Sequence, residues 1–114
     1  MWRDDAYFLD ILIAARKVLQ YTEGISWEGF KEDILLQDAV MRNLQIVGEA
    51  ARKVSDESRA AHSGIPWAEI IGMRNRLVHE YFRIDVEKVW ETARDDIPTL
   101  VRLIEPLVPP EDQV

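Results

Sequence analysis

The side chains best suited to chemistry lie in one stretch, residues 67–82, where an arginine, an asparagine and a histidine follow one another within six positions. Apolar residues recur there at helical spacing. A helix advances about 100° per residue, so Arg74 falls near the centre of the apolar face. A guanidinium on such a face is costly unless it is paired or hydrogen-bonded. Arg74 is therefore either a structural arginine, satisfied by a buried carboxylate or a helix C-terminus, or a functional one that binds an anion. The apolar face comprises Trp67, Ile70, Ile71, Leu77, Val78 and Tyr81.

A second, narrower stripe runs along the flank of the same predicted helix through Gly72, Asn75 and His79. Glycine inside a helix costs about 1 kcal/mol relative to alanine, so we expect a close neighbour at Gly72. Asn75 and His79 are i, i+4 neighbours, and the amide could hold the imidazole in one tautomer. An imidazole suits proton transfer near neutral pH, although a lone histidine on a helix is more often structural. The other histidine, His62, lies in a predicted loop.

A carboxylate, Glu49, lies off the main apolar stripe of an earlier predicted helix. Arg52 and Lys53 follow it at i+3 and i+4, which favours a solvated face of ion pairs. The functional alternative is a carboxylate that positions Arg74. Gly48 beside it suggests that two helices cross closely at this point.

The elements that must position these side chains are all helices. Apolar periodicity predicts helices at about residues 4–21, 32–54, 66–82, 86–94 and 96–107, with a further turn at 56–61. Asp4, Asp5, Asp95 and Asp96 are interpreted as helix N-terminal charges and Asp85 as a cap. Short loops between long helices favour antiparallel neighbours. We expect an all-α, antiparallel bundle of four to five helices, in a single domain spanning residues 1–114.

The composition excludes several classes of protein. Apolar residues make up 47% and charged residues 31%, a globular balance, and cysteine is absent, which rules out disulfides and thiolate chemistry. The N-terminus is acidic and the longest uncharged apolar run there, residues 11–15, is too short for a bilayer. We therefore expect a cytoplasmic protein with no membrane partner. Two separated histidines predict no metal site, and scattered glycines give no phosphate loop, so no cofactor is expected.

The net charge of −7 argues against extensive nucleic-acid binding, because phosphate contacts need lysine and arginine. The charge is unevenly distributed, however. Residues 42–94 hold nine basic and eight acidic residues, whereas both ends of the chain are acidic. This distribution favours an acidic protein that contacts RNA locally.

The sequence from Arg74 to Tyr81 reads R-N-x3-H-x-Y. It resembles the R-x4-6-H signature of the HEPN superfamily, and Tyr81 matches the R-x4-H-x-Y version found in HepT-type toxins. R-x4-H alone is a weak signal, but the resemblance continues in the right order over nearly the whole chain. The matching segments are residues 3–12, 38–40, 46–51, 65–67, Asp85, Trp90 and 96–98.

The resemblance implies a metal-independent endoribonuclease, the toxin of a HepT/MntA toxin–antitoxin pair. It implies a homodimer in which the motifs of two protomers meet in a cleft. Arg74 and His79 lie about 140° apart around their helix, which is awkward for converging on one phosphate within a protomer. A symmetric dimer with a self-complementary patch around Gly72 would bring two such pairs together. The resemblance further implies that an MntA-type nucleotidyltransferase antitoxin adds AMP to Tyr81, which would otherwise be only the last aromatic of the apolar face.

A mechanism without a metal follows for the RNA substrate. His79 would take the proton from a ribose 2′-hydroxyl or deliver one to the leaving 5′-oxygen. Arg74 would hold the phosphate and stabilise the charge of the transition state, and Asn75 would orient His79. The expected product ends are a 2′,3′-cyclic phosphate and a 5′-hydroxyl. Arg76 and Arg83 are candidate contacts to RNA or to the antitoxin.

Two other functions remain open at this point. The first is a non-catalytic, nucleotide- or protein-binding helical partner of a nucleotidyltransferase, which suits the acidic net charge and the missing basic surface. The second is a purely structural four-helix dimer, which leaves Arg74 on the apolar face without a purpose.

Overall fold

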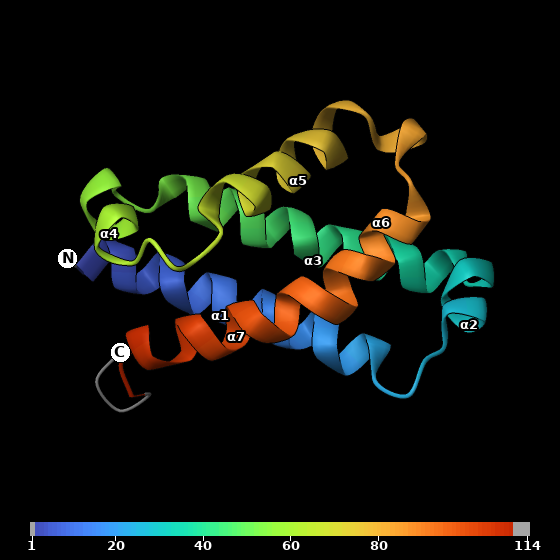
Figure 1. Cartoon of the computed structure of the whole chain (residues 1–114), viewed down its shortest axis with the longest axis horizontal. Helices are drawn as coiled ribbons and strands as arrows, with labels where there is room; N and C mark the ends of the chain where they lie inside the picture. The colour runs from blue at the N-terminus through green and yellow to red at the C-terminus, as the bar shows by residue number, and fades with distance from the viewer. Residues whose placement is uncertain (1, 111–114) are drawn as a thin grey trace.

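The computed structural model describes residues 2–110, and within them every regular element is helical. Four helical segments form the body, and Figure 1 shows them running in alternating directions. The predicted all-α, antiparallel bundle is thus confirmed; its homodimeric state stays a prediction. The elements in chain order are α1 (Trp2–Thr22), α2 (Trp27–Glu32), α3 (Ile34–Lys53), α4 (Asp56–Ala61), α5 (Trp67–His79), the 3-10 turn η1 (Tyr81–Arg83), α6 (Val86–Glu91), the π-helical η2 (Thr92–Asp96), α7 (Ile97–Ile104) and the 3-10 turn η3 (Glu105–Leu107).

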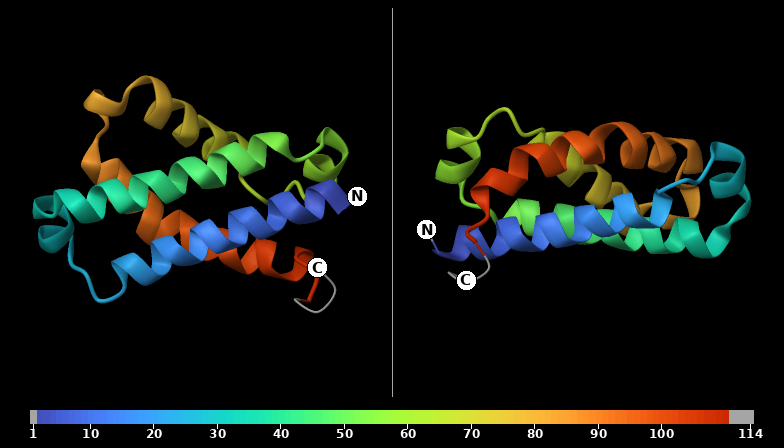
Figure 2. Two further views of the ribbon diagram at one scale, coloured as in Figure 1. Left: turned by 180° about the vertical axis from the view of Figure 1, so that it is seen from behind. Right: turned by 90° about the horizontal axis from the view of Figure 1, so that it is seen from below.

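The two long helices α1 and α3 form the centre of the bundle and pack against each other along their length. Helix α5 packs on α3, and α7 packs on α1, so that α5 and the α6–α7 segment lie on the same side of the central pair (Figure 2). Helix α5, which carries the sequence motif, therefore has α3 as its main neighbour. Any side chain that positions the motif from within the protomer is expected on α3.

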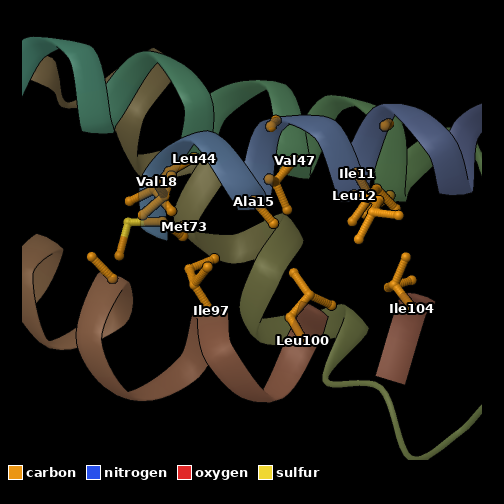
Figure 3. Packing of buried hydrophobic residues seen from close by; sticks show 14 of the residues in the cluster. Ile11, Leu12, Ala15, Val18, Leu44, Val47, Met73, Ile97, Leu100 and Ile104 are labelled. Carbon is orange, nitrogen blue, oxygen red and sulfur yellow. The ribbon is translucent and has the colours of Figure 1, made fainter. Parts of the chain in front are cut away.

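The core is a cluster of aliphatic side chains between these helices (Figure 3). Burying one such leucine, isoleucine or valine side chain contributes about 1.5–3 kcal/mol, so the cluster supplies most of the driving force for folding. Helix α5 joins it through Trp67, Met73 and Leu77, of which only Met73 was missing from the predicted apolar face. Its labelled members are Ile11, Leu12, Ala15 and Val18 of α1, Leu44 and Val47 of α3, Met73 of α5, and Ile97, Leu100 and Ile104 of α7.

The short helix α2 was not predicted. Ser26 caps its N-terminus by accepting a hydrogen bond from the amide of Gly29 at 3.1 Å, and Phe30 is fully buried. The side-chain amide of Gln37 donates to the carbonyls of Phe30 and Lys31 at 2.8 and 2.9 Å, which satisfies the end of α2. Helix α3 begins at Ile34 rather than at residue 32, since Asp33 separates the two helices and caps α3.

Helix α5 ends at His79, three residues before its predicted end at 82. The chain then tightens into η1, where the amide of Arg83 donates to the carbonyl of Glu80 at 2.8 Å. The predicted extension was wrong because the turn folds back onto α3 through a side-chain contact of Tyr81, described below. Asp85 caps α6 as predicted, by accepting from the amide of Glu87 at 3.0 Å.

The two helices predicted after this cap, at 86–94 and 96–107, form one continuous helical segment. The π-helical turn η2 joins α6 to α7, and Asp96 keeps a right-handed helical backbone. Pro98 has no N–H to donate to the helical ladder, so a change of hydrogen-bond register before it is a low-cost solution. The proline therefore marks a register change and not a new helix start.

Asp4, interpreted from the sequence as a charge at the start of α1, also forms hydrogen bonds to residues at the start of α4. Its carboxylate is 3% exposed and accepts hydrogen bonds from the amide of Ser55 at 3.0 Å and from the hydroxyls of Ser55 and Ser58 at 2.7 and 2.6 Å. These bonds, that of Ser58 first, hold the pKa of Asp4 below its ordinary value. The contact ties the start of α1 to α4.

None of the helices in residues 2–110 combines the length and the apolar character needed to span a bilayer.

Candidate active site

The site begins at the crossing of α3 and α5. Gly48 of α3 is buried directly beneath Arg74 of α5. A methyl group on Gly48 would overlap the Cβ of Arg74 and would lie 2.9 Å from its Cγ and 3.1 Å from the carbonyl oxygen of Ile70. Only glycine allows this approach, so the close crossing suggested by the sequence is confirmed. It places Glu49, the next residue of α3, beside the guanidinium.

Arg74 is held by two oxygen acceptors. Its Nε donates to Oε1 of Glu49 at 2.7 Å, its NH2 group pairs with the same carboxylate, and its NH1 donates to Oδ1 of Asn75 at 2.9 Å. An arginine side chain carries five N–H donors, so two remain for a ligand. The side chain is 14% exposed, which limits its movement while leaving part of it open to solvent. These hydrogen bonds and the ion pair offset the free-energy cost of placing a guanidinium on an apolar face.

The interpretation of Glu49 as part of a solvated face with Arg52 and Lys53 is wrong. Its carboxylate forms its ion pair with Arg74, twenty-five residues along the chain, and Arg52 and Lys53 act on it only through space. The hydrogen bond from Arg74 is the main cause that holds the pKa of Glu49 below its ordinary value. The alternative, a carboxylate that positions Arg74, matches the geometry.

We expected Asn75 and His79 to contact each other, but in the structure they do not. The carbonyl oxygen of Asn75 accepts from Arg74, and within residues 2–110 His79 forms no hydrogen bond or ion pair. The expectation that Asn75 orients His79 is therefore wrong for the single protomer, because the guanidinium lies closer. His79 is exposed as the last residue of α5.

Gly72 has no close neighbour within the protomer. A methyl group built on it would meet no heavy atom within 4 Å, so the neighbour expected from its place inside a helix is absent from residues 2–110. The surface of α5 around Gly72, Asn75 and His79 is open, and it is the face on which a second copy was expected to pack.

Tyr81 lies beyond α5, in η1, and its hydroxyl donates to Oδ1 of Asp38 on α3 at 2.7 Å. This hydrogen bond is the main cause that raises the pKa of Tyr81 above its ordinary value. Tyr81 is 43% exposed, and its ring packs edge-on against Phe82, with the centroids 5.4 Å apart. Asp38 was not predicted as a site residue; its only signal was its place in the family-like segment 38–40.

The two other arginines of the prediction, Arg76 and Arg83, are exposed and line a cavity together with Lys88. They do not join Arg74 in one hydrogen-bonded cluster. Among residues 2–110, no three carboxylate, imidazole or thiol side chains gather as a metal site would require.

The sequence motif indicated a class of helical bundle that carries an arginine and a histidine on one helix. The structure has this arrangement, and a glutamate of the facing helix holds the arginine. The family model described as "Ribonuclease HepT-like" matches residues 11–107. The chain belongs to the HepT-like ribonuclease family, which confirms the resemblance drawn from the sequence.

Relatives that are named as ribonucleases match this sequence over most of its length. It is 38% identical over 105 residues to "Putative RNase TTE0752" of Caldanaerobacter subterraneus subsp. tengcongensis, a match that covers 92% of this chain and 94% of that protein. It is 39% identical over 94 residues to "Probable ribonuclease HepT" of Thermococcus cleftensis, with 82% and 86% covered. A third relative, "Putative RNase MJ1380" of Methanocaldococcus jannaschii, is 35% identical over 100 residues, with 88% and 92% covered. No solved structure is significantly similar to the chain.

Proposed function

We propose that this chain is the toxin of a type VII-like toxin–antitoxin pair and acts in the cytoplasm as a metal-independent endoribonuclease of the HepT kind. The observation that carries the proposal is the arrangement of Arg74, which Glu49 and Asn75 hold with two N–H groups unused, on the helix that ends with exposed His79. A fixed cation and a free imidazole are the two groups that cleavage of RNA through its own 2′-hydroxyl requires.

The proposed reaction is an internal transfer. An imidazole of His79 accepts the proton of the ribose 2′-hydroxyl while that oxygen attacks the neighbouring phosphorus. The bond from phosphorus to the 5′-oxygen breaks, and that oxygen leaves with a proton delivered by imidazolium. Arg74 binds the non-bridging oxygens and stabilises the charge that grows on them. The products carry a 2′,3′-cyclic phosphate and a 5′-hydroxyl.

We propose that the site is completed by a second copy of the chain. Arg74 and His79 lie about 140° apart around α5, so one protomer presents them in different directions. The open surface at Gly72 supports a close, self-complementary packing of two α5 helices there. Such a dimer would place two Arg74 and two His79 side chains in one cleft.

Tyr81 is the proposed point of control. Its exposed ring and its place two residues after His79 support modification by a nucleotidyltransferase antitoxin of the MntA type. Each AMP group would add negative charge and bulk where the RNA must approach. Arg76 and Arg83, both exposed, are proposed contacts to RNA or to the antitoxin.

The second candidate function is a non-catalytic partner of a nucleotidyltransferase that binds a nucleotide or a protein. The ion pair between Arg74 and Glu49 favours it, since a paired arginine can serve structure alone. The two functions differ in what they require of His79, which only catalysis needs.

Growth after induced expression of the chain separates the two functions. We expect arrest by the wild type and normal growth with the His79→Ala variant at equal protein level. Normal growth with both would contradict the toxin. Co-expression with the proposed MntA-type antitoxin, followed by mass spectrometry, tests the control step: AMP on Tyr81 is expected, and an unmodified Tyr81 would contradict it.

A further inference from the structure

Two adjoining cavities lie between α5 and the α6–α7 segment, and Leu44 and Val47 of α3 line one of them. The turn η1 joins α5 to α6 (Figure 1). The cavity volumes are about 160 and about 150 Å³, and Met73, Arg76 and Lys88 line both cavities. They therefore form one groove with two compartments. Nothing in the proposed cleavage reaction uses this groove.

The second compartment is cationic. Arg76, Arg83 and Lys88 line it, and none of the three side chains forms an ion pair or hydrogen bond with any of residues 2–110. Glu80 and Asp85 also line it, and the carboxylate of Asp85 already caps α6. In a chain with a net charge of −7, a gathering of unpaired cations is a local site for an anion.

The first compartment has an apolar floor, and charged side chains of both signs line it as well, the carboxylates of Glu69 and Asp96 and the cations Arg76 and Lys88. Its size is that of a cavity that accepts a six-membered ring, since an apolar cavity of about 150 Å³ binds benzene. The carboxylates of Glu69 and Asp96 stand at the rim, where they can accept hydrogen bonds from amino groups. The floor consists of Leu44, Val47, Ile70, Met73, Ile97 and Leu100.

We propose that this groove holds one nucleotide of the RNA substrate outside the bond that is cut. The phosphate lies among Arg76, Arg83 and Lys88, and the base enters the apolar compartment. The inference rests on the proposed ribonuclease function. Arg76 stands one helical turn before His79, so the groove continues the RNA path from the proposed cleavage point.

The rim sets a base preference. Among the pyrimidines, whose single six-membered ring matches the size of the compartment, cytosine carries an exocyclic amino group that can donate to Glu69 or Asp96, whereas uracil carries none. Cytosine is therefore favoured at the position that occupies the groove, and uracil is disfavoured there.

Binding of a fluorescein-labelled single-stranded RNA to the His79→Ala protein tests the phosphate half, with Kd measured at several salt concentrations. Lys88→Ala removes one phosphate contact, so the slope of log Kd against log salt concentration should fall by about 0.7. Lys17→Ala is the matched control, because Lys17 is exposed on α1 and lines neither compartment. Lys88→Arg should keep the slope. Equal slopes for Lys88→Ala and Lys17→Ala would overturn the inference.

A set of the same oligonucleotides, each with a single abasic nucleotide, tests the base half. We expect one position at which loss of the base weakens binding, and at which uracil binds more weakly than cytosine. Uniform affinity across the set would overturn it. Cytidine 5′-monophosphate provides a further arm: Lys88-dependent binding of this mononucleotide as tight as that of the oligonucleotide would assign the groove to a free nucleotide and overturn the RNA path.

Cleavage of the oligonucleotide by the chain with His79 intact, measured in parallel, separates this inference from the proposed function. Cleavage together with binding that does not depend on Lys88 would overturn the groove and leave the ribonuclease standing. Lys88-dependent binding without any cleavage would contradict the ribonuclease and support the groove as an RNA-binding surface.

Discussion

Gly48 and Arg74 meet at the crossing of α3 and α5, where the Cγ of Arg74 lies 2.9 Å from the point that a side chain on Gly48 would occupy. The contact fixes the distance between α5 and α3 at their crossing. It also decides which residue of α3 faces the guanidinium, and that residue is Glu49. A glycine with no chemistry of its own thus sets the geometry of the arginine on which the proposed reaction depends.

Replacing that glycine tests the crossing. Gly48→Ala should lower the free energy of unfolding by about 1–3 kcal/mol, because overpacking outweighs the better helix propensity of alanine. The melting temperature measured by circular dichroism should fall by several degrees. Gly64→Ala is the control, since a side chain there would meet nothing within 4 Å. Equal melting temperatures for Gly48→Ala and the wild type would contradict the tight crossing.

Gly72→Ala should have opposite effects on the protomer and on the proposed dimer. Within the protomer the methyl group meets nothing within 4 Å, and alanine is the better helix former by up to about 1 kcal/mol. Between two copies packed at this point, the same methyl group would separate the helices. Dilute protein should therefore become more stable to urea while sedimentation shows weaker association. An unchanged dimer would place the interface elsewhere.

The pair of Glu49 and Arg74 should make stability depend on acid pH. Its hydrogen bond to Arg74 lowers the pKa of Glu49 in the folded chain, whereas the unfolded value is about 4.3. The stabilisation is thus present above that value and is lost as pH falls through the lower, folded value. Urea unfolding of the wild type and of Glu49→Gln should differ at pH 7 and converge in acid. A difference that persists unchanged in acid would contradict a role for the ionised carboxylate.

The contact between Tyr81 and Asp38 should be visible in the titration of tyrosine. The hydrogen bond to the Asp38 carboxylate is the main cause that raises the pKa of Tyr81, and Asp38→Asn replaces that carboxylate by a weaker, neutral acceptor, so this phenol should ionise at lower pH, nearer 10. Because the folded pKa is the higher one, the stabilisation is present below about pH 10 and is lost as pH rises through the folded value. Ultraviolet absorbance measures the titration, and Tyr81→Phe assigns the signal. Identical curves for Asp38→Asn and the wild type would exclude the hydrogen bond in solution.

Helical periodicity was sufficient to predict the long helices of the fold, because each must turn one apolar face to the core. It also placed the turn at 56–61, which is α4. It missed α2, a six-residue helix with Phe30 as its one buried side chain and too short to show a period. It also split α6–α7 at Pro98, because local sequence does not show that a π-helical turn can carry the chain past a proline.

The helix that carries the site residues was predicted from the sequence, but the residues that contact them were not. The position of Arg74 on an apolar face indicated that a carboxylate must pair with it, yet local charge pairing favoured Arg52 and Lys53 as the partners of Glu49. The contacts that decide the matter join residues twenty-five and forty-three positions apart, Arg74 with Glu49 and Tyr81 with Asp38. Spacing along one helix cannot show such contacts; only the packing of α5 and η1 on α3 does.

Cleavage of RNA by the purified chain in the presence of a metal chelator tests the central claim most directly. The wild type should cut the RNA and leave 2′,3′-cyclic phosphate and 5′-hydroxyl ends. His79→Ala should lose this cleavage, whereas His62→Ala, which changes the histidine outside the motif, should retain it. Undiminished cleavage by His79→Ala, or 5′-phosphate ends from the wild type, would contradict the account.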